Sequence, residues 1–460
     1  MFSFQKLIQD HLHERLPLYN NVNPQFAKVL QTIGFDKNFV RAKGVSLFDD
    51  SGQEYFDFLS GYGVFALGRN HPQIQAGLQE LIQLDLPNML QMEAPLLAGL
   101  LAQKLVALTG HGVRDKVFFT NSGTEAIEGA LKFAKAATGR DKFLYLDHAF
   151  HGLSTGSLAI NGNAEFRSKF EPLLPGQKIP LNDWQALEME LQTQNYAAFV
   201  FEPIQGKGVF LPDVDFIQQA KLLCDKTDTL LIADEIQTGL GRTGKWMACE
   251  RFGVEPDIVT FAKALSAGSL PVGAIVYTNA IYKKVFSSME ECVIHSSTFS
   301  KNTLAMGCGL MSLDLLESEK LLQNALEQGA VLKAGLVALQ SQSEWIKDVR
   351  GEGLMLAIEF HRPTSFKKQL IWDAVQKMNH GLFAQLVVMR LFSEHHFMTQ
   401  VSGHHQDIVK ILPPLIITSE HVQNFLTAFA KTLQDCESVT GPLLQMGANL
   451  AKHVIKNVRS

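Results

Sequence analysis

Short segments rich in β-branched and aromatic residues alternate with helical patterns through the middle of this 460-residue chain. No other feature restricts the fold as strongly, because strands separated by helices favour a mainly parallel sheet with helices on both faces. The predicted strands cover residues 116–120, 142–146, 197–201, 230–233, 257–261 and 272–277. The sequence therefore predicts an α/β fold.

Polar residues and glycines follow five of these strands. Ligands of such sheets bind at the carboxyl ends of the strands. The residues at these ends are Ser122, Gly123, Thr124, Phe150, His151, Gly152, Glu202, Asp234, Glu235 and Lys263. We expect these five strand ends to offer their side chains to one edge of the sheet.

The composition is that of a globular protein, with 46% hydrophobic and 19% charged residues, which allows one or two closely joined domains. The net charge of -5 is small and the basic residues are scattered, so we expect no nucleic-acid partner. No segment reaches the roughly 18 apolar residues of a membrane helix, and the first residues do not resemble a secretory signal. We expect small-molecule partners, no membrane and a cytoplasmic location.

Cysteines and histidines give no sign of a disulfide framework or a metal site. The five cysteines are far apart and odd in number, so we expect reduced thiols in the core. The candidate metal ligands have no known ligand spacing, and we expect none of them to bind metal. They are His295, His395, His396, His404 and His405.

The segments on either side of the predicted sheet are expected to form a smaller α+β domain. Residues 349–360 and 408–417 have the pattern of strands between helices, and the tail after Pro442 has that of an amphipathic helix. The predicted division is an N-terminal segment at 1–55 that contributes to the small domain, a large domain at 56–317 and a C-terminal small domain at 318–460.

Residues 119–126 end a strand and open a helix, where free backbone N–H groups and the helix dipole favour a phosphate. Ser122 and Glu125 also satisfy the capping-box pattern, so simple helix capping is the alternative.

Asp234 and Lys263 follow two of the apolar strands. A buried carboxylate needs a cation or hydrogen bonds, and the protonated ring nitrogen of a cofactor would be such a cation, although a salt bridge or cap is the alternative. A desolvated lysine is a usable nucleophile and base, although a lysine extending from a sheet edge to solvent is the alternative. Together with a phosphate cradle, these two residues supply the contacts that pyridoxal phosphate requires.

From about residue 55 to residue 415 the chain resembles the class III aminotransferases, which are pyridoxal-phosphate enzymes of fold type I. This family includes ornithine, acetylornithine, 4-aminobutyrate and putrescine aminotransferases. The most specific part is the ordered set DEIQTG at 234–239, GRTG at 241–244, Pro256-Asp257 and Ala262-Lys263. The resemblance implies a large domain with a mainly parallel seven-stranded sheet, a smaller α+β domain and pyridoxal 5'-phosphate as cofactor.

The resemblance also implies roles for individual residues. Lys263 would hold the cofactor as a Schiff base and move the proton between substrate and cofactor, while Asp234 would keep the pyridine nitrogen protonated. Thr298 would reach the phosphate in the neighbouring subunit, so a homodimer with shared sites is expected. The other implied contacts are Ser122, Gly123 and Thr124 with the phosphate, Phe150 and Ile236 with the ring faces, and Gln237 with the ring hydroxyl.

Two positions depart from the family pattern. Relatives that act on α-amino acids have an arginine just before a Pro-Pro-Leu element, where it binds a carboxylate through two hydrogen bonds, but this chain has Lys410. Lysine is not an equivalent substitute. Lys207 stands where the family commonly has glutamate, whereas Glu202 is kept. We hypothesise that Glu202 pairs with Lys410, which would suit the site poorly to an α-carboxylate.

Residues 60–65 align with the family segment that lines the substrate entrance, and Tyr62 and Phe65 make this segment aromatic. Ordinary packing at a dimer contact is the alternative. An aromatic entrance would favour an apolar amine or aldehyde over a short dicarboxylate.

The resemblance implies a transaminase in which an amino donor and a carbonyl acceptor react in turn. One substrate pair is expected to be an ω-amine or diamine and its aldehyde, and the other an amino acid and its oxo acid. An aminomutase, racemase or decarboxylase on the same fold is an alternative. A non-catalytic binding or scaffold protein is another, but the retention of Asp234 and Lys263 argues against it.

Overall fold

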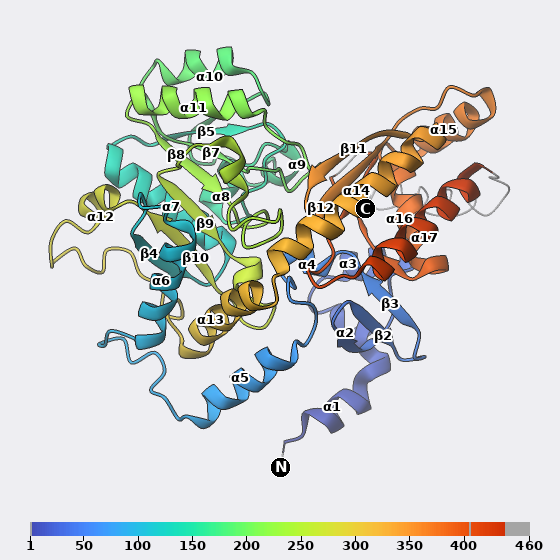
Figure 1. Ribbon diagram of the computed structural model, residues 1–460, viewed down its shortest axis with the longest axis horizontal. Coiled ribbons are helices and arrows are strands. Elements are labelled where there is room, and N and C mark those ends of the chain that lie inside the picture. Colours follow the sequence, from blue (N-terminus) through green and yellow to red (C-terminus); the bar gives the residue numbers. More distant parts are fainter. Residues whose placement is uncertain (1, 404–405, 438–460) are drawn as a thin grey trace.

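The computed structural model describes residues 2–403 and 406–437, and it contains a seven-stranded sheet with helices on both faces (Figure 1). The strand order is β4-β10-β9-β8-β7-β5-β6. Strand β10 is antiparallel to its neighbours β4 and β9, and the other four pairs are parallel. The strands are β4 (Lys116–Thr120), β5 (Lys142–Leu146), β6 (Gly176–Ile179), β7 (Tyr196–Phe201), β8 (Leu230–Asp234), β9 (Ile258–Phe261) and β10 (Gly273–Tyr277). The predicted mainly parallel α/β fold is confirmed.

Alternating side chains of the central strands enter two separate cores, as the two-residue period of a strand requires. In β7, Phe199 and Phe201 face one core, and Ala198 and Val200 face the other. The first core also holds side chains of α6 (Leu96–Thr109), α10 (Trp184–Leu191), α11 (Val214–Lys226) and α13 (Thr303–Ser318). The second holds those of α7 (Gly123–Thr138) and α12 (Asn279–Val285). The sheet is therefore covered on both faces.

Strand β6 was not predicted from the sequence. It lies at the edge of the sheet, and of its four residues only Ile179 is buried. An edge strand with one buried side chain lacks the apolar run that identifies a strand in a sequence.

The C-terminal part forms a four-stranded antiparallel sheet of order β11-β12-β15-β14. Its strands are β11 (Ile346–Glu352), β12 (Met355–Phe360), β15 (Ile408–Ile411) and β14 (Gln400–Val401). Its helices are α14 (Leu321–Gln342), α15 (Phe366–Met378), α16 (Leu382–His395) and α17 (Ser419–Glu437). The single strand predicted at 349–360 is thus part of a hairpin, and the one predicted at 408–417 ends at Ile411.

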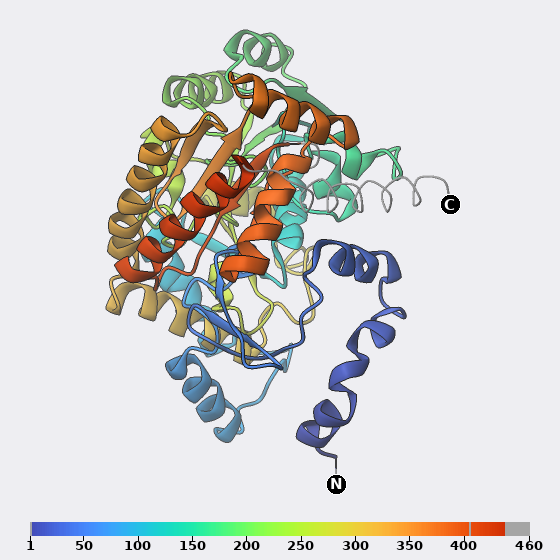
Figure 2. The same cartoon turned by 90° about the vertical axis from the view of Figure 1, so that its right-hand side faces the viewer.

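A third sheet joins the N-terminal segment to the C-terminal part. Its order is β1 (Phe39–Lys43), β2 (Ser46–Asp49), β3 (Glu54–Asp57) and β13 (Phe397–Met398). Before it, α1 (Phe4–His11), η1 (Leu12–Glu14), α2 (Arg15–Tyr19) and α3 (Pro24–Ile33) extend from the body of the protein (Figure 2). No residue of α1 or α2 is buried, and α3 buries only Ala27.

The remaining helices are short except for α5, which lies at the lower edge of the view in Figure 1. They are α4 (Ser60–Gly63), α5 (Pro72–Gln83), α8 (Thr155–Ala159), α9 (Ala164–Arg167), η2 (Ala248–Phe252) and η3 (Lys263–Ser266). In the described part of the chain, no helix combines the length and apolar character needed to cross a membrane. The helix predicted after Pro442 lies outside the described residues, and the division at 55/56 and 317/318 stays a prediction.

Close packing between α14 and the β11–β12 hairpin gives a test of the fold. A Cβ atom at Gly329 would lie 2.2 Å from the carbonyl oxygen of Gly353, whereas one at Gly99, in α6, would meet nothing within 4 Å. We expect Gly329→Ala to lower the free energy of unfolding by about 1–3 kcal/mol, because the hairpin backbone must move. Gly99→Ala should be neutral or slightly stabilising, because alanine favours helices. Urea unfolding measures both, and equal effects would contradict this packing.

Candidate active site

A cavity of about 640 Å³ lies at the carboxyl ends of the parallel strands. It brings together residues from loops that follow β4, β5, β7, β8 and β9. The predicted site residues that line it are Ser122, Gly123, Thr124, Phe150, Glu202, Asp234, Ile236, Gln237 and Lys263. Tyr62, Phe65, Thr298 and Lys410 are not among the lining residues.

The turn from β4 into α7 leaves backbone N–H groups free at the cavity. The hydroxyl of Ser122 accepts the N–H of Glu125 at 3.3 Å, and the Glu125 carboxylate accepts the N–H of Asn121 at 2.9 Å. Within the described chain, the N–H groups of Gly123 and Thr124 make no hydrogen bond. Capping therefore uses only part of this helix end, and two donors remain for an anion such as a phosphate.

The side chain of Thr124 fixes this turn to the loop after β5. Its hydroxyl lies 2.6 Å from that of Ser154 and 2.7 Å from that of Ser157. Opposite, Gly123 approaches Ile236 so closely that a Cβ atom there would lie 2.9 Å from the Ile236 Cδ1 atom. A larger residue at Gly123 would therefore narrow the cavity beside the N-terminus of α7.

At the end of β8, the carboxylate of Asp234 is buried and has two close partners. It accepts a hydrogen bond from Nδ1 of His151 at 2.7 Å and one from the N–H of Ile236 at 3.1 Å. Burial opposes the charge of His151, but the bond to Asp234 and the charges of Asp234 and Glu202 prevail and raise the pKa of His151. The hydrogen bond from His151 thus supports the carboxylate from the side.

His151 was not predicted as a site residue, although the segment 150–152 was placed at the ligand edge. The signal that could have identified His151 is that a buried Asp234 needs a hydrogen-bond donor and that a histidine follows another strand of the same sheet. Nε2 of His151 is buried and has no partner in the described chain.

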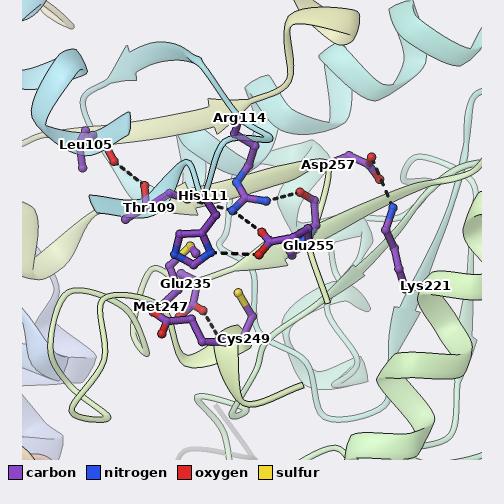
Figure 3. Close-up of polar contacts among 12 residues, drawn as sticks. Leu105, Thr109, His111, Arg114, Lys221, Glu235, Met247, Cys249, Glu255 and Asp257 are labelled. Carbon is purple, nitrogen blue, oxygen red and sulfur yellow. Dashed lines mark hydrogen bonds and ion pairs between the residues drawn. The ribbon is translucent and has the colours of Figure 1, made fainter. Parts of the chain in front are cut away.

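Glu235, next to Asp234, lies outside the cavity lining and has a structural role (Figure 3). Its carboxylate accepts the N–H of Cys249 at 2.7 Å and the hydroxyl of Thr238. Burial, the largest influence, raises the pKa of Glu235. Consecutive residues at a strand end point to opposite sides, so only one of these two carboxylates can serve the cavity.

Strand β9 is anchored at its start and carries Lys263 just beyond its end. The buried Arg114 donates to the carbonyl of Pro256 at 2.6 Å and to Glu255 at 2.8 Å (Figure 3). Asp257 accepts the N–H of Leu231 at 2.8 Å. These bonds fix β9 against the sheet, and hence the position from which Lys263 projects.

Lys263 has a left-handed backbone with φ of 45°, a strained conformation that is concentrated at functional sites. Its carbonyl accepts the hydroxyl of Ser266 at 2.9 Å. Burial lowers the pKa of Lys263, although the charges of Asp234 and Glu202 oppose this effect. A desolvated amine at the cavity wall is suited to act as a nucleophile and base.

The carboxylate of Glu202 holds backbone groups and does not pair with Lys410, so the hypothesis of a direct ion pair is wrong. It accepts the N–H of Phe150 at 3.0 Å and that of Gly206 at 2.8 Å, and burial raises its pKa. Lys410 instead donates to the carbonyl of Gly206 at 2.8 Å and to Gln237 at 3.1 Å. The pairing fails because a backbone segment lies between the two side chains.

Lys410 is 3% exposed and lies behind the cavity wall. Burial, followed by the charges of Lys263 and Lys207, lowers the pKa of Lys410 to about 7. The Nζ atom of Lys207 lies 5.3 Å from the ring centroid of Phe150 and 5.2 Å from that of Phe166. The amine of Lys207 therefore lies near Phe150, which lines the cavity.

The residues predicted at the entrance and at the dimer contact lie outside the cavity lining. Tyr62 is 56% exposed, and the ring of Phe65 lies under the guanidinium of Arg69 at 3.6 Å. Their segment reaches the cavity through Val64. Thr298 is exposed, and its carbonyl accepts a hydrogen bond from Gln91 at 3.2 Å. In the described residues, no three potential metal ligands gather.

A lysine, a carboxylate and a free helix N-terminus around one cavity of a mainly parallel sheet fit a pyridoxal-phosphate enzyme of fold type I. The family model for aminotransferase class-III matches residues 33–433. The chain therefore belongs to the class III aminotransferases, and its cofactor is pyridoxal 5'-phosphate.

Relatives with curated names support this assignment. Putrescine aminotransferase from Pectobacterium atrosepticum is 39% identical over 74% of this chain and 75% of its own length. Acetylornithine aminotransferase from Bacillus cereus is 36% identical over 86% of this chain and 94% of its own length. Aminotransferase PigE from a Serratia species is 33% identical over 89% of this chain, but the chain spans only about half, 52%, of that longer protein.

Solved structures of this family have the same fold. Ornithine aminotransferase from Toxoplasma gondii is similar with a TM-score of 0.77 and 30% identity over 87% of this chain and 90% of that one. A second structure of the Toxoplasma gondii enzyme, described as having partial occupancy of pyridoxal phosphate at its active site, has a TM-score of 0.80. Its identity is 27% over 95% of this chain and 100% of that one.

Because the pKa of His151 is raised above its ordinary value of 6.5, its stabilising effect should depend on pH. The effect is complete below about pH 6.5 and is lost as pH rises through the higher folded-state pKa. We expect His151→Leu to lower the free energy of unfolding of the cofactor-free protein by about 2–4 kcal/mol in acid and by less in alkali.

Urea unfolding of the wild type and of His151→Leu, at pH values below and above 6.5, measures the difference in their free energies of unfolding. His13→Leu is the matched control, because His13 lies 3.6 Å from Asp50 at the surface, where an ion pair contributes little. A loss for His151→Leu that is the same at every pH would contradict the charged pair.

Proposed function

We propose that this aminotransferase exchanges an ω-amine or diamine for its aldehyde, with an amino acid and its oxo acid as the second substrate pair. The observation that carries the proposal is the desolvated Lys263 in one cavity with Asp234 and two free N–H groups of α7. The substrate class is supported by Lys410, since a buried lysine that already has two acceptors lacks the planar fork of an arginine.

In this proposal the described residues have separate tasks. Lys263 holds the cofactor and moves a proton at the substrate carbon. Asp234, supported by His151, keeps a proton on the pyridine nitrogen. The bound cofactor supplies the electron sink for bond cleavage at that carbon. Ser122, Gly123 and Thr124 hold the phosphate, Phe150 and Ile236 border the ring, and Gln237 contacts the ring hydroxyl.

The entrance is part of the same proposal. Tyr62 and Phe65 remain candidates for the outer substrate path, because Val64 between them borders the cavity. Both carboxylate oxygens of Glu202 accept hydrogen bonds from backbone N–H groups, so the role of Glu202 is to position Phe150. An apolar amine or aldehyde suits such an entrance better than a short dicarboxylate.

An absorbance spectrum of the purified protein, before and after addition of amines and amino acids, tests the proposal. We expect a visible band that disappears in Lys263→Ala, because that variant lacks the amine that binds the cofactor. One donor class should bleach the band and leave the amine form of the cofactor, which a racemase or decarboxylase would not accumulate. A wild-type protein that stays colourless with pyridoxal phosphate would overturn the proposal, and binding without turnover would favour a scaffold role.

We also propose a homodimer with shared sites and a cytoplasmic location. The N-terminal helices and the loop that carries Thr298 expose apolar side chains that a second copy could cover. These include Phe4, Ile8, Val22, Val293 and Phe299. The described residues contain no disulfide, which suits a reducing compartment, but Cys292 is exposed and is therefore not the core thiol that was expected.

Thr298 gives a test of the shared site. We expect Thr298→Ala to raise the dissociation constant of pyridoxal phosphate about tenfold, because a hydrogen bond to the charged phosphate is lost. Ser296→Ala, at an exposed position of the same loop, should leave that constant unchanged. Equilibrium dialysis measures binding, and light scattering measures the oligomeric state. A monomer that binds normally, or equal effects of the two variants, would exclude sharing through Thr298.

A further inference from the structure

The carboxamide of Gln237 is held at both ends. Its Oε1 atom accepts a hydrogen bond from Nζ of Lys410 at 3.1 Å, and its Nε2 atom donates to the carbonyl of Tyr62 at 2.9 Å. An ammonium group can only donate and a carbonyl can only accept. These partners therefore determine which end of the amide is oxygen and which is nitrogen.

Lys410 is fixed where it stands. It belongs to β15 in the sheet of the C-terminal part, and its second hydrogen bond goes to the carbonyl of Gly206 at 2.8 Å. Its side chain thus reaches from that sheet to Gln237, just beyond β8 of the large sheet. Gln237 borders the cavity and Lys410 does not, so Lys410 can act on the cavity through Gln237.

We propose that Lys410 is a positioning residue: it fixes the amide of Gln237 so that this side chain offers the cavity a hydrogen-bond donor and no acceptor. One N–H of Gln237 is held by Tyr62 and the second remains for the cofactor. A donor here complements an ionised ring oxygen of pyridoxal phosphate. This inference rests on the proposed cofactor contact of Gln237.

The charges around Lys410 are compatible with this role. Lys263, Lys207 and Arg242 disfavour its charge, Glu202 favours it, and with burial as the largest influence the pKa falls to about 7. A neutral amine still has two N–H groups, the number that its two acceptors require. The amide of Gln237 can therefore be held in either protonation state of Lys410.

A double-mutant cycle on the holoenzyme tests this inference, with Lys410→Met to remove the donor and Lys410→Arg to retain one. The readouts are the dissociation constant of pyridoxal phosphate and the pH midpoint of its visible band. Lys410→Met should weaken binding at least about fivefold and shift the midpoint, because the Oε1 end of Gln237 then loses its donor and the amide is held only through Tyr62. Lys410→Arg should restore both values. In a Gln237→Ala background, Lys410→Met should change neither value further.

The inference would be overturned if Lys410→Met kept the wild-type dissociation constant and midpoint. It would also be overturned if Lys410→Met weakened binding as much in the Gln237→Ala background as in the wild type. Gln237→Glu provides a second variant if Lys410→Met does not fold, because it keeps Lys410 and removes the N–H groups of the amide. It should shift the midpoint, and an unchanged midpoint would also overturn the inference. A wild-type protein without a visible band would instead refute the proposed function, so the two failures are distinguishable.

Discussion

The buried hydrogen bond between Asp234 and His151 is the interaction around which the cavity is built. It joins the end of β8 to the loop after β5, and so it also joins two strands that are not adjacent in the sheet. A carboxylate at this depth is stable only with such a partner. The fold places it there because parallel strands end at a common edge, and helices on both faces exclude water from the strands between them.

More ionisable side chains are buried around this bond than a stable core would need. Lys263, Lys410 and Glu202 lie within a few residues of strand ends, and burial shifts the pKa of each toward its neutral form. Backbone groups take up much of the hydrogen-bonding capacity of Glu202 and Lys410. Such a concentration of perturbed groups is typical of a catalytic cavity.

The sequence alone predicted those features whose signal lies within one segment of the chain. Strands β4 and β5 were predicted with the bounds they have, and the residues after β4, β8 and β9 line one cavity. It did not predict the contacts between segments that are distant in the sequence. His151 lies 83 positions from Asp234, and the partner of Lys410 depends on how β15 lies against the turn at Gly206. Periodicity reports which face of an element is buried, but not which side chain of another element it meets.

The pairing of β3 with β13 has a consequence for how the chain folds during synthesis. Phe56 in the N-terminal sheet lies beside Phe397, more than three hundred positions later, so that sheet stays incomplete until most of the chain has been made. The strands of the large sheet lie between these two positions and can pair earlier with neighbours nearer in sequence. Until β13 has been made, the outer edge of β3 therefore stays unpaired and can pair with other chains.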